Sequence, residues 1–544
     1  MVKPLDYILT PGEAQQLTHF IAARGHQPTL LKSLSSEPTE HDEVPFKTDD
    51  DYALARVLPA VSRRTLRIFA FVFAATSVTE NALTIALKRR WPTFKPASAM
   101  RLALFVASYS AVYRLSLRYL LVALPKLVAR RYPRMRGASV SRDSERRTTK
   151  RSLYSRGMLR LLSSPYLPPA LAGLLAGPTI LLDASGQRRI TVVLYALTRS
   201  IQAAYDGMIQ SEWLPATLRE RRLLWGGHIL FALCNAQLLH AFVFHPDCFP
   251  KAYSDFILGH SKVYIPSKPA FLPPAASWPT PRETVNTIAK IASDKKPYPA
   301  FDSPLLHPEA GKSMLPADGR FDTVKPILDM LAHPGHTRLV SAILHPAEPS
   351  GWETFKAHMS AELPPSLRFM SILSGLGMLL RYKKVLRDPE NAVYSFVTST
   401  LGGSIFLSGA IGSAWASIDL FGKYLSPRTL PKERWYLQGF LAGLFVLFQR
   451  NRATDLAIYT ARLSIQSAWQ IAVKRRRVKP IPNGEAIYFA LSTALLMALF
   501  EVKPKSIRSG LIQSLLTQII GPSKAASKPQ PEETEEGESD EGSQ

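Results

Sequence analysis

Long apolar segments, separated by charged or proline-rich stretches, constrain what this chain can fold into. The first runs over residues 66–87, close to the roughly 20 residues that a helix needs to cross a bilayer. Basic residues border such segments directly, as in Lys88-Arg89-Arg90 and in 474–477. Lys and Arg at the ends of apolar helices match lipid headgroups. The pattern predicts an all-α, polytopic helical membrane protein.

The charge and the cysteine content of the chain narrow the class of protein further. The formal net charge is +25, which a soluble nucleic-acid-binding protein could also carry. Because the basic residues adjoin apolar segments, membrane lipids rather than nucleic acids are the expected partners. The chain has 2 cysteines, Cys234 and Cys248, so no disulfide framework is expected. A reducing compartment or an organelle membrane fits this use of cysteine.

The two ends of the chain are polar. Residues 1–62 form a predicted polar N-terminal extension, and residues 523–544 form an acidic tail that is expected to be disordered. The N-terminal residues lack the basic and apolar regions of a secretory signal, so none is expected there. The C-terminal residues 542–544 do not match a peroxisomal matrix address, which an integral membrane protein would not need.

The apolar segments fall into two groups. They define a first membrane half at 63–260 and a second at 364–522, separated by a Pro-rich polar linker at 261–363. The prolines exclude long helices from the linker but leave room for short ones at about 322–360. The predicted helices cover about 66–87, 102–123, 168–182, 190–209 and 224–243 in the first half, and 366–380, 392–421, 435–448, 455–473 and 484–500 in the second.

The orientation in the membrane stays open. The loop at 126–160 is strongly basic, which favours the cytosolic side. The shorter loop at 88–101 is basic as well. If the segment 102–123 crosses the membrane, the two loops lie on opposite sides. The distribution of positive charge therefore does not decide the topology.

The two halves repeat short motifs in the same order. Their offsets along the chain are 266, 264 and 258 residues, so only small deletions separate the copies. This order predicts two copies of one helical unit, packed around a pseudo-two-fold axis. Whether the copies are parallel or inverted depends on the number of spans, which stays open. The matching motifs are 173–177 with 439–443, 200–205 with 464–469, and 231–233 with 489–491.

Small residues recur at the same places in both copies. Two glycines four residues apart open a short helix in each half, and a serine and a glycine with the same spacing lie in an earlier helix of the second half. Without side chains at such positions, two helix backbones can approach closely. Loose use of glycine in apolar helices is the alternative interpretation. The residues predicted to pack helices together are Gly173, Gly177, Gly439, Gly443, Ser408 and Gly412.

The chain carries no catalytic motif. It lacks a glycine-rich phosphate loop, an HExxH zinc helix and a GxSxG elbow. His240, His245, Asp247 and Cys248 cluster near the end of the predicted helix 224–243, but a metal site needs three or four ligands held together. They are interpreted as polar residues where a helix meets water. No catalytic residue, cofactor or metal is predicted.

Polar side chains inside apolar segments are the candidates for a transport path. Glu80, Arg114, Asn235 and Asp419 lie in predicted helices, where polar groups usually face a partner helix or a wet cavity. Hydrogen bonds between helices explain Asn235 and Asp419 equally well. Arg114 and Arg118 are four residues apart and share a helix face. They either face the interior of a bundle or extend to the lipid headgroups.

Two sets of residues carry a family resemblance. The first is 231–233 through 245–247 with Pro250, Tyr253 and 256–258, and the second is the pattern of Gly443, Tyr459 and Trp469. On these residues the chain resembles the transmembrane protein 135 family over about 65–260 and 365–520. The fungal members of that family look similar in layout, with two apolar halves around a polar middle. The acidic tail and the long Pro-rich insert depart from the family pattern.

The resemblance implies similarity to the inner-membrane translocase channel proteins of mitochondria and to small peroxisomal membrane proteins. It also implies a place in peroxisomes or mitochondria, with roles in lipid and fatty-acid metabolism or organelle dynamics. No catalytic residue of the family carries over to this chain.

Three functions are compatible with these features. The expected one is a non-enzymatic, multi-pass organelle-membrane protein, peroxisomal in preference to mitochondrial, that acts in lipid handling or organelle dynamics. Its expected partners are membrane lipids, and a second copy or other organelle membrane proteins. A transporter that uses the four polar side chains is one alternative. A membrane-embedded lipid-modifying enzyme that uses His240, His245 and Asp247 is the other.

Overall fold

The structure is a computed structural model that describes most of the chain. The described residues are 49–88, 96–131, 162, 164–184, 186–210, 226–273, 275–294, 301, 319, 321–426, 429–507 and 510–523. Their regular structure is entirely helical, which confirms the all-α prediction. Most of the predicted N-terminal extension, most of the basic loop at 126–160 and nearly all of the acidic tail lie outside the described residues.

The chain forms two compact units, and the first combines two segments that are far apart in the sequence. Unit 1 contains Met1–Leu214 and Ile481–Gln544, and unit 2 contains Pro215–Pro480. The sequence divides the chain differently, with one half at 63–260 and the other at 364–522. The two divisions differ because one helix of each half packs with the other half, as the contacts below show.

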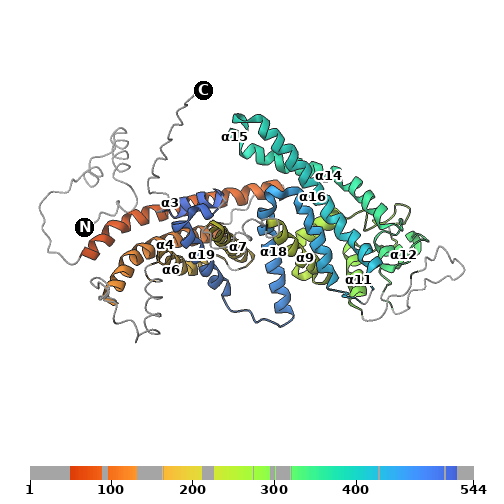
Figure 1. The fold of residues 1–544 in the computed structure, drawn as a ribbon, viewed down its shortest axis with the longest axis horizontal. Helices are drawn as coiled ribbons and strands as arrows, with labels where there is room; N and C mark the ends of the chain where they lie inside the picture. The colour runs from red at the N-terminus through yellow and green to blue at the C-terminus, as the bar shows by residue number, and fades with distance from the viewer. Residues whose placement is uncertain are drawn as a thin grey trace, which may run out of the picture. The chain divides into compact units, whose positions relative to one another are not determined.

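Unit 1 is a helical bundle completed by a helix from near the end of the chain. α3 (Asp49–Lys88) lies beside α4 (Pro96–Arg131), which also packs on α6 (Leu167–Ala176) (Figure 1). α19 (Gly484–Val502) packs against α6 and α7 (Gln187–Gln210). Buried apolar side chains of unit 1, such as Tyr113, Ile180 and Phe489, form one core. The remaining elements are η4 (Gly177–Leu182), η8 (Pro504–Ser506) and α20 (Gly510–Ile519).

Unit 2 combines a long helical pair with a three-helix group. α14 (Gly351–Leu380) lies along α16 (Pro389–Tyr424) (Figure 1). α9 (Gly227–Phe244) packs against α17 (Arg434–Gly443) and α18 (Ala453–Lys474). The other elements are η5 (Pro246–Cys248), α10 (Lys251–Gly259), α11 (Pro281–Ser293), α12 (Lys325–Leu331), α13 (Leu339–Leu344), α15 (Tyr382–Arg387) and η7 (Leu444–Arg452).

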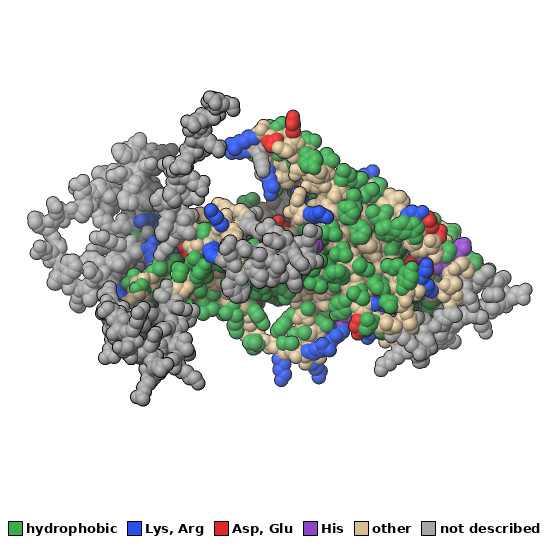
Figure 2. All heavy atoms as spheres, in the orientation of Figure 1, with side chains coloured by type: hydrophobic (Ala, Val, Ile, Leu, Met, Phe, Trp, Pro, Cys, Tyr) green, Lys and Arg blue, Asp and Glu red, His purple; other side chains and the backbone are tan. Residues whose placement is uncertain are grey.

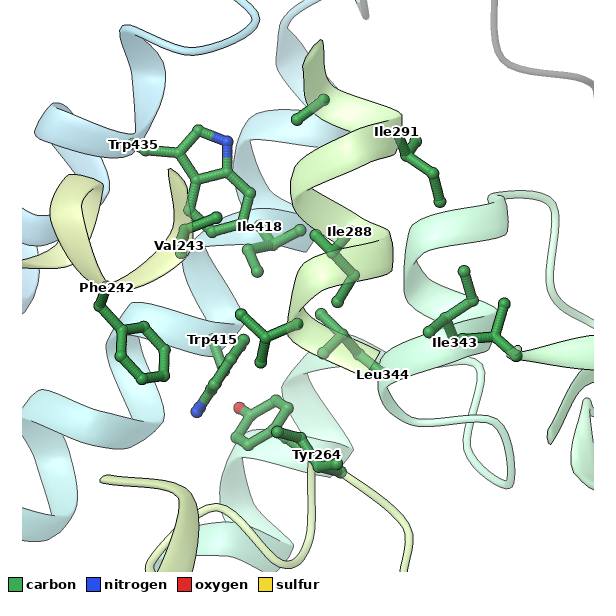
Figure 3. Close-up of a cluster of buried hydrophobic side chains, with 14 of the residues drawn as sticks. Phe242, Val243, Tyr264, Ile288, Ile291, Ile343, Leu344, Trp415, Ile418 and Trp435 are labelled. Carbon is green, nitrogen blue, oxygen red and sulfur yellow. The ribbon is translucent and has the colours of Figure 1, made fainter. Parts of the chain in front are cut away.

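The segment predicted as a linker, 261–363, is a packed part of unit 2 where it is described. Tyr264, Ile288 and Leu344 come from this segment and share one buried cluster with Trp415 of α16 (Figure 3). Each of these side chains is almost fully buried. Where the segment is described, its helices before α14 are short, and they bury enough apolar surface to hold it on the unit.

Two helices that start in this segment, α11 and α14, show what determines a helix start here. α11 begins with a capping box, in which the Thr280 hydroxyl accepts from the Glu283 N–H and the Glu283 carboxylate accepts from the Thr280 N–H. α14 begins at Gly351, earlier than the predicted start at 366. The sequence places that start after Pro364 and Pro365, because proline removes a backbone donor. In the structure both prolines lie inside α14, which packs along α16.

Both halves of the chain run through the same series of helices. α4 and α16 each contain 36 residues, and α6 and α17 each contain 10. A 3₁₀ segment follows α6 and α17, and then comes α7 with 24 residues or α18 with 22. α9 with 18 residues or α19 with 19 follows, and a short 3₁₀ turn that starts at Pro246 or Pro504 comes next. This correspondence extends the repeat beyond its short sequence motifs.

The repeated glycines lie at equivalent helix contacts. An added Cβ atom at any of the four would lie only 2.3–2.7 Å from a backbone atom of the facing helix. No larger residue fits there without separating the two backbones, as expected for small residues at a close helix crossing. The facing residues are themselves 258 positions apart in the two copies. The pairs are Gly173 with Thr493, Gly439 with Asn235, Gly177 with Ala490 and Gly443 with Ala232.

The two copies exchange their last helices. α9 ends the first copy but packs in unit 2 on α17 and α18 of the second copy. α19 ends the second copy but packs in unit 1 on α6 and α7 of the first copy. The same glycine contacts occur in both units. The contact of α9 with α17 is therefore equivalent to the contact of α19 with α6.

Two equivalent hydrogen bonds accompany these glycine contacts. Asn235 Nδ2 donates to the Gly439 carbonyl oxygen at 2.8 Å, and Thr493 Oγ1 donates to that of Gly173 at 3.0 Å. We expect Asn235→Leu to lower the free energy of unfolding by about 1 kcal/mol, the usual scale for such bonds between membrane helices. Thr493→Val should cost less, because the Thr493 hydroxyl also lies 2.9 Å from Phe489 O in its own helix.

Thermal unfolding of the purified protein in detergent would measure both changes. Thr398→Val is the control, because the exposed Thr398 hydroxyl bonds only within its own helix, to Tyr394 O and Ser395 O. An Asn235→Leu variant as stable as Thr398→Val would show that the bond to Gly439 contributes nothing.

Four of the described helices are long and apolar enough to cross a membrane, namely α9, α14, α16 and α19. α14 is the least covered of them, with 11% of its most apolar window buried. Hydrophobic side chains cover much of the visible face over α14 and α16 (Figure 2). α3 and α4, which contain the predicted segments 66–87 and 102–123, are not among the four.

Candidate functional site

Unit 2 contains a cavity of about 1190 Å³ at the end of the α14–α16 pair where α14 starts and α16 ends. The volume exceeds the roughly 300–1,000 Å³ that is typical of small-molecule pockets. One side is apolar and includes Leu441, Phe445 and Phe448 from α17 and η7. Another side holds Arg338 and Asp419. A ligand that is partly apolar and partly polar therefore suits this cavity.

Asp419 is the acidic group of the site. Its Oδ2 atom lies 2.6 Å from His345 Nε2, and the Ser341 hydroxyl donates to its Oδ1. His345 Nδ1 lies 2.7 Å from the Glu348 carbonyl oxygen. Because both imidazole nitrogens face acceptors, both donate and the ring is a charged imidazolium. Asp419 and His345 thus form an ion pair in which the side chains are 16% and 2% exposed.

The start of α14 approaches the same carboxylate. A Cβ atom at Gly351 would lie 2.7 Å from Asp419 Oδ2, so the absence of a side chain permits the approach. The N-terminus of a helix carries partial positive charge, which favours a nearby carboxylate. The negative charge of Asp419 is therefore balanced from two sides, by His345 and by α14.

The surroundings shift the pKa values of two neighbouring histidines in opposite directions. Burial lowers the pKa of His345, but the hydrogen bond and the negative charge of Asp419 outweigh burial, so that this pKa is raised above its usual value. Burial, with the nearby charge of His345, lowers the pKa of His336. Nε2 of His336 lies 3.1 Å from the His345 carbonyl oxygen, so the proton of its neutral ring sits on that nitrogen.

The Ser341, Asp419 and His345 side chains do not have the geometry of a hydrolase triad. In a triad the histidine lies between the serine and the acid and removes the hydroxyl proton. Here Asp419 lies in the middle, and Ser341 donates directly to the carboxylate. The arrangement suits a charge-balanced anchor between α13, α14 and α16 rather than nucleophilic catalysis.

A smaller cavity of about 310 Å³ shares Thr337, Arg338 and Ser341 with the larger one. Its walls come from α11, α13, α16 and the start of α17. Arg434 and Gln438 line it and are 8% and 1% exposed. These two polar side chains of the small cavity are thus deeply buried, although apolar residues form most of the cavity wall.

The residues predicted for a transport path have different surroundings where the structure describes them. Asp419 lines the large cavity, whereas Asn235 holds α9 to α17 through Gly439. Arg114 belongs to unit 1 and donates to the backbone oxygens of Ile519 and Ile520. The Glu80 side chain lies outside the described residues. Among the described side chains, Asn235 and Asp419 therefore act at two different helix contacts.

The predicted small-residue stripe of α16 lies against α14. Ser408 Oγ lies 2.9 Å from Ser366 Oγ and also donates to the Glu362 carbonyl oxygen. A Cβ atom at Gly412 would lie 2.6 Å from the His358 ring. Small residues on α16 therefore make room for polar side chains of α14 inside the contact.

The polar cluster after α9 is engaged with the end of α18. Asp247 forms an ion pair with Lys474, and Arg475 lies 3.0 Å from His245 Nε2. The His240 ring stacks on Tyr436, with 4.2 Å between ring centres. Within the part of the chain that the structure describes, no group of three or more His, Cys, Asp or Glu residues could hold a metal ion.

Sequence reasoning missed the partners of Asp419. Ser341 lies in α13 and His345 directly follows it, inside the segment predicted as a linker. One signal was available, because the apolar run 339–344 is interrupted only by Ser341 and is typical of a short buried helix. Arg434 was also missed, since it directly precedes the predicted helix at 435–448.

Comparison with known proteins gives no match to any protein-family model, curated protein or solved structure. The resemblance to the transmembrane protein 135 family therefore stays a prediction.

Proposed function

We propose that this chain is a multi-pass organelle-membrane protein that binds lipid without transforming it chemically. The observation that carries the proposal is the exposed apolar surface of α14. Ile372 and Leu379 are 73% and 68% exposed, although they lie in a helix that is long and apolar enough to cross a membrane. Large contiguous apolar surfaces are unfavourable in water, and lipid is a solvent that stabilises them.

The large cavity supports the lipid-binding part of the proposal. It combines the apolar residues Leu441, Phe445 and Phe448 with the basic residues Arg338 and Lys423. The one acidic group on its wall, Asp419, is neutralised by His345. The basic residues are therefore left to attract an anionic headgroup, while the apolar wall suits an acyl chain.

The cellular part of the proposal rests on the sequence resemblance. It favours a peroxisomal or, as second choice, a mitochondrial membrane, and a role in lipid and fatty-acid metabolism or organelle dynamics. At Ser341, Asp419 and His345 the serine donates to the carboxylate rather than to the histidine, so this group does not support the enzymatic alternative.

Membrane extraction tests the proposal. We expect the tagged full-length chain to stay in the membrane pellet after alkaline carbonate treatment and to co-localise with a peroxisomal marker. Release of the chain by carbonate would contradict membrane insertion. Co-localisation with mitochondria alone would contradict only the choice of organelle.

A matched pair of substitutions sharpens this test. Ile372→Lys places a charge on the lipid-exposed face of α14, where a charge is costly. Leu386→Lys changes an equally exposed residue of α15, 77% exposed and flanked by Arg387. In water both changes should be harmless. In a membrane, we expect only Ile372→Lys to reduce the carbonate-resistant fraction, so equal behaviour of the two variants would count against lipid contact.

A further inference from the structure

The small cavity of unit 2 contains polar groups without partners. The Nε atom of Arg434, the indole nitrogen of Trp435 and Oε1 of Gln438 are buried and have no hydrogen-bond partner among the described residues. All three side chains come from the start of α17 and line the same cavity. The Trp435 indole lies beside Ile418 and Ile288, which also line the cavity (Figure 3).

Arg434 is the most unusual of the three. Arg434 is 8% exposed. No carboxylate of the described residues lies within ion-pair distance of its side chain. A buried charge is normally paired, because burial removes its hydration. An unpaired guanidinium on the wall of a cavity therefore indicates a missing anion rather than a structural contact.

The remaining lining is consistent with a small oxyanion. Arg338 supplies a second positive charge on the cavity wall, and the Trp435 N–H and the guanidinium supply donors. The planar guanidinium fork matches phosphate oxygens in a bidentate manner. Gln438 Oε1 is an acceptor, so it suits a hydroxyl group on the ligand. The volume of about 310 Å³ holds a headgroup-sized molecule.

We propose that this cavity binds a phosphate group, with Arg434 and Arg338 as its cationic partners and Trp435 Nε1 as a further donor. The phosphate can belong to a lipid headgroup or to a soluble phosphate compound. The shared residues Thr337, Arg338 and Ser341 place the site next to the large apolar cavity. The assignment depends on unit 2 alone and does not require the chain to be inserted in a membrane.

Binding to the purified full-length protein in a phosphate-free detergent solution tests the assignment. The probes are inorganic phosphate, short-chain phosphatidic acid and the diacylglycerol of the same chain length, which lacks only the phosphate. Calorimetry and the shift in melting temperature are the measurements. Binding of phosphatidic acid alone supports a lipid headgroup, and binding of inorganic phosphate supports a soluble source. Equal binding of phosphatidic acid and diacylglycerol, or no binding of either phosphate probe, overturns the assignment.

Substitution of Arg434 separates a ligand site from a structural role. Arg434→Met keeps an unbranched apolar stem in place of the arginine stem and removes the guanidinium with its charge. We expect at least tenfold weaker phosphate binding, together with an unliganded protein that melts at the same or a higher temperature, because an unpaired buried charge is gone. Arg452→Gln, at an exposed arginine outside the cavity, is the control and should bind like the unmodified protein. Unchanged phosphate binding by Arg434→Met would refute the proposal even if the variant were less stable.

Discussion

Replacing Asp419 with Ala is expected to lower the free energy of unfolding by about 3–5 kcal/mol, the usual cost of removing one partner of a buried ion pair. The substitution leaves the charged His345 ring, 2% exposed, without its carboxylate. It also removes the acceptor of the Ser341 hydroxyl and the negative charge beside the start of α14. Thermal or denaturant unfolding of the purified protein in detergent would measure the loss.

A double substitution is the control for this prediction. In Asp419→Asn with His345→Gln neither charge remains, so the pair should recover much of the stability lost in Asp419→Asn alone. If the two single losses simply add in the double variant, the two side chains are not coupled and the ion pair contributes nothing.

The pH dependence of stability offers a second measurement on the same pair. The pKa of His345 is raised in the folded protein, although burial by itself lowers it, because Asp419 holds the proton on the ring. The unfolded value is about 6.5. The stabilisation is therefore complete below about pH 6.5 and is lost as the pH rises through the higher folded pKa. The difference in stability between the unmodified protein and His345→Gln should shrink in that direction, and a difference that grows with pH would contradict the assignment.

Alanine at Gly177 or Gly443 is expected to destabilise the protein by about 1–3 kcal/mol, as overpacking of a closely packed contact does. The new Cβ atom would lie 2.3 Å from the Cα of Ala490 or 2.6 Å from that of Ala232. Both obstacles are backbone atoms, so a side-chain rotation cannot relieve the clash. The whole facing helix must move away. The melting temperature of each variant would report the loss.

Gly377→Ala is the matched control. Gly377 also lies inside a helix, α14, but an added Cβ atom would meet nothing within 4 Å. Alanine has the higher helix propensity, so this change should be neutral or stabilising by up to about 1 kcal/mol. Variants at Gly177 and Gly443 that behaved like Gly377→Ala would show that the helices are not in close contact there.

Periodicity and repeated motifs were sufficient to predict most of the apolar helices and the internal repeat. The predicted segments at 190–209 and 484–500 fall within α7 and α19, because apolar residues recur along both with helical spacing and no proline interrupts them. The glycine motif could be recognised because the same close contact requires the same small residue in both copies. Helical periodicity and the glycine motif can both be read from a few consecutive turns of one helix.

The packing of the linker and the surroundings of Asp419 could not be predicted in this way. Proline content predicts short helices at most around 261–304, but it does not reveal that Tyr264 and Ile288 are buried against Trp415. The partner of Asp419, His345, is 74 residues away in the chain and belongs to no periodic pattern. Contacts of this kind depend on the tertiary arrangement, which a pattern within one segment does not encode.

The exchange of α9 and α19 determines the order in which the chain can complete its structure during synthesis. Unit 2 is one continuous stretch, Pro215–Pro480, so all of its described helices are synthesised before α19. Unit 1 has to keep α6 and α7 without their partner until α19 appears, about 300 residues after η4 ends. At about 5–20 residues per second this interval lasts roughly 15–60 s. During that time the glycine-lined face of α6 is open to lipid, insertion factors or a second nascent chain.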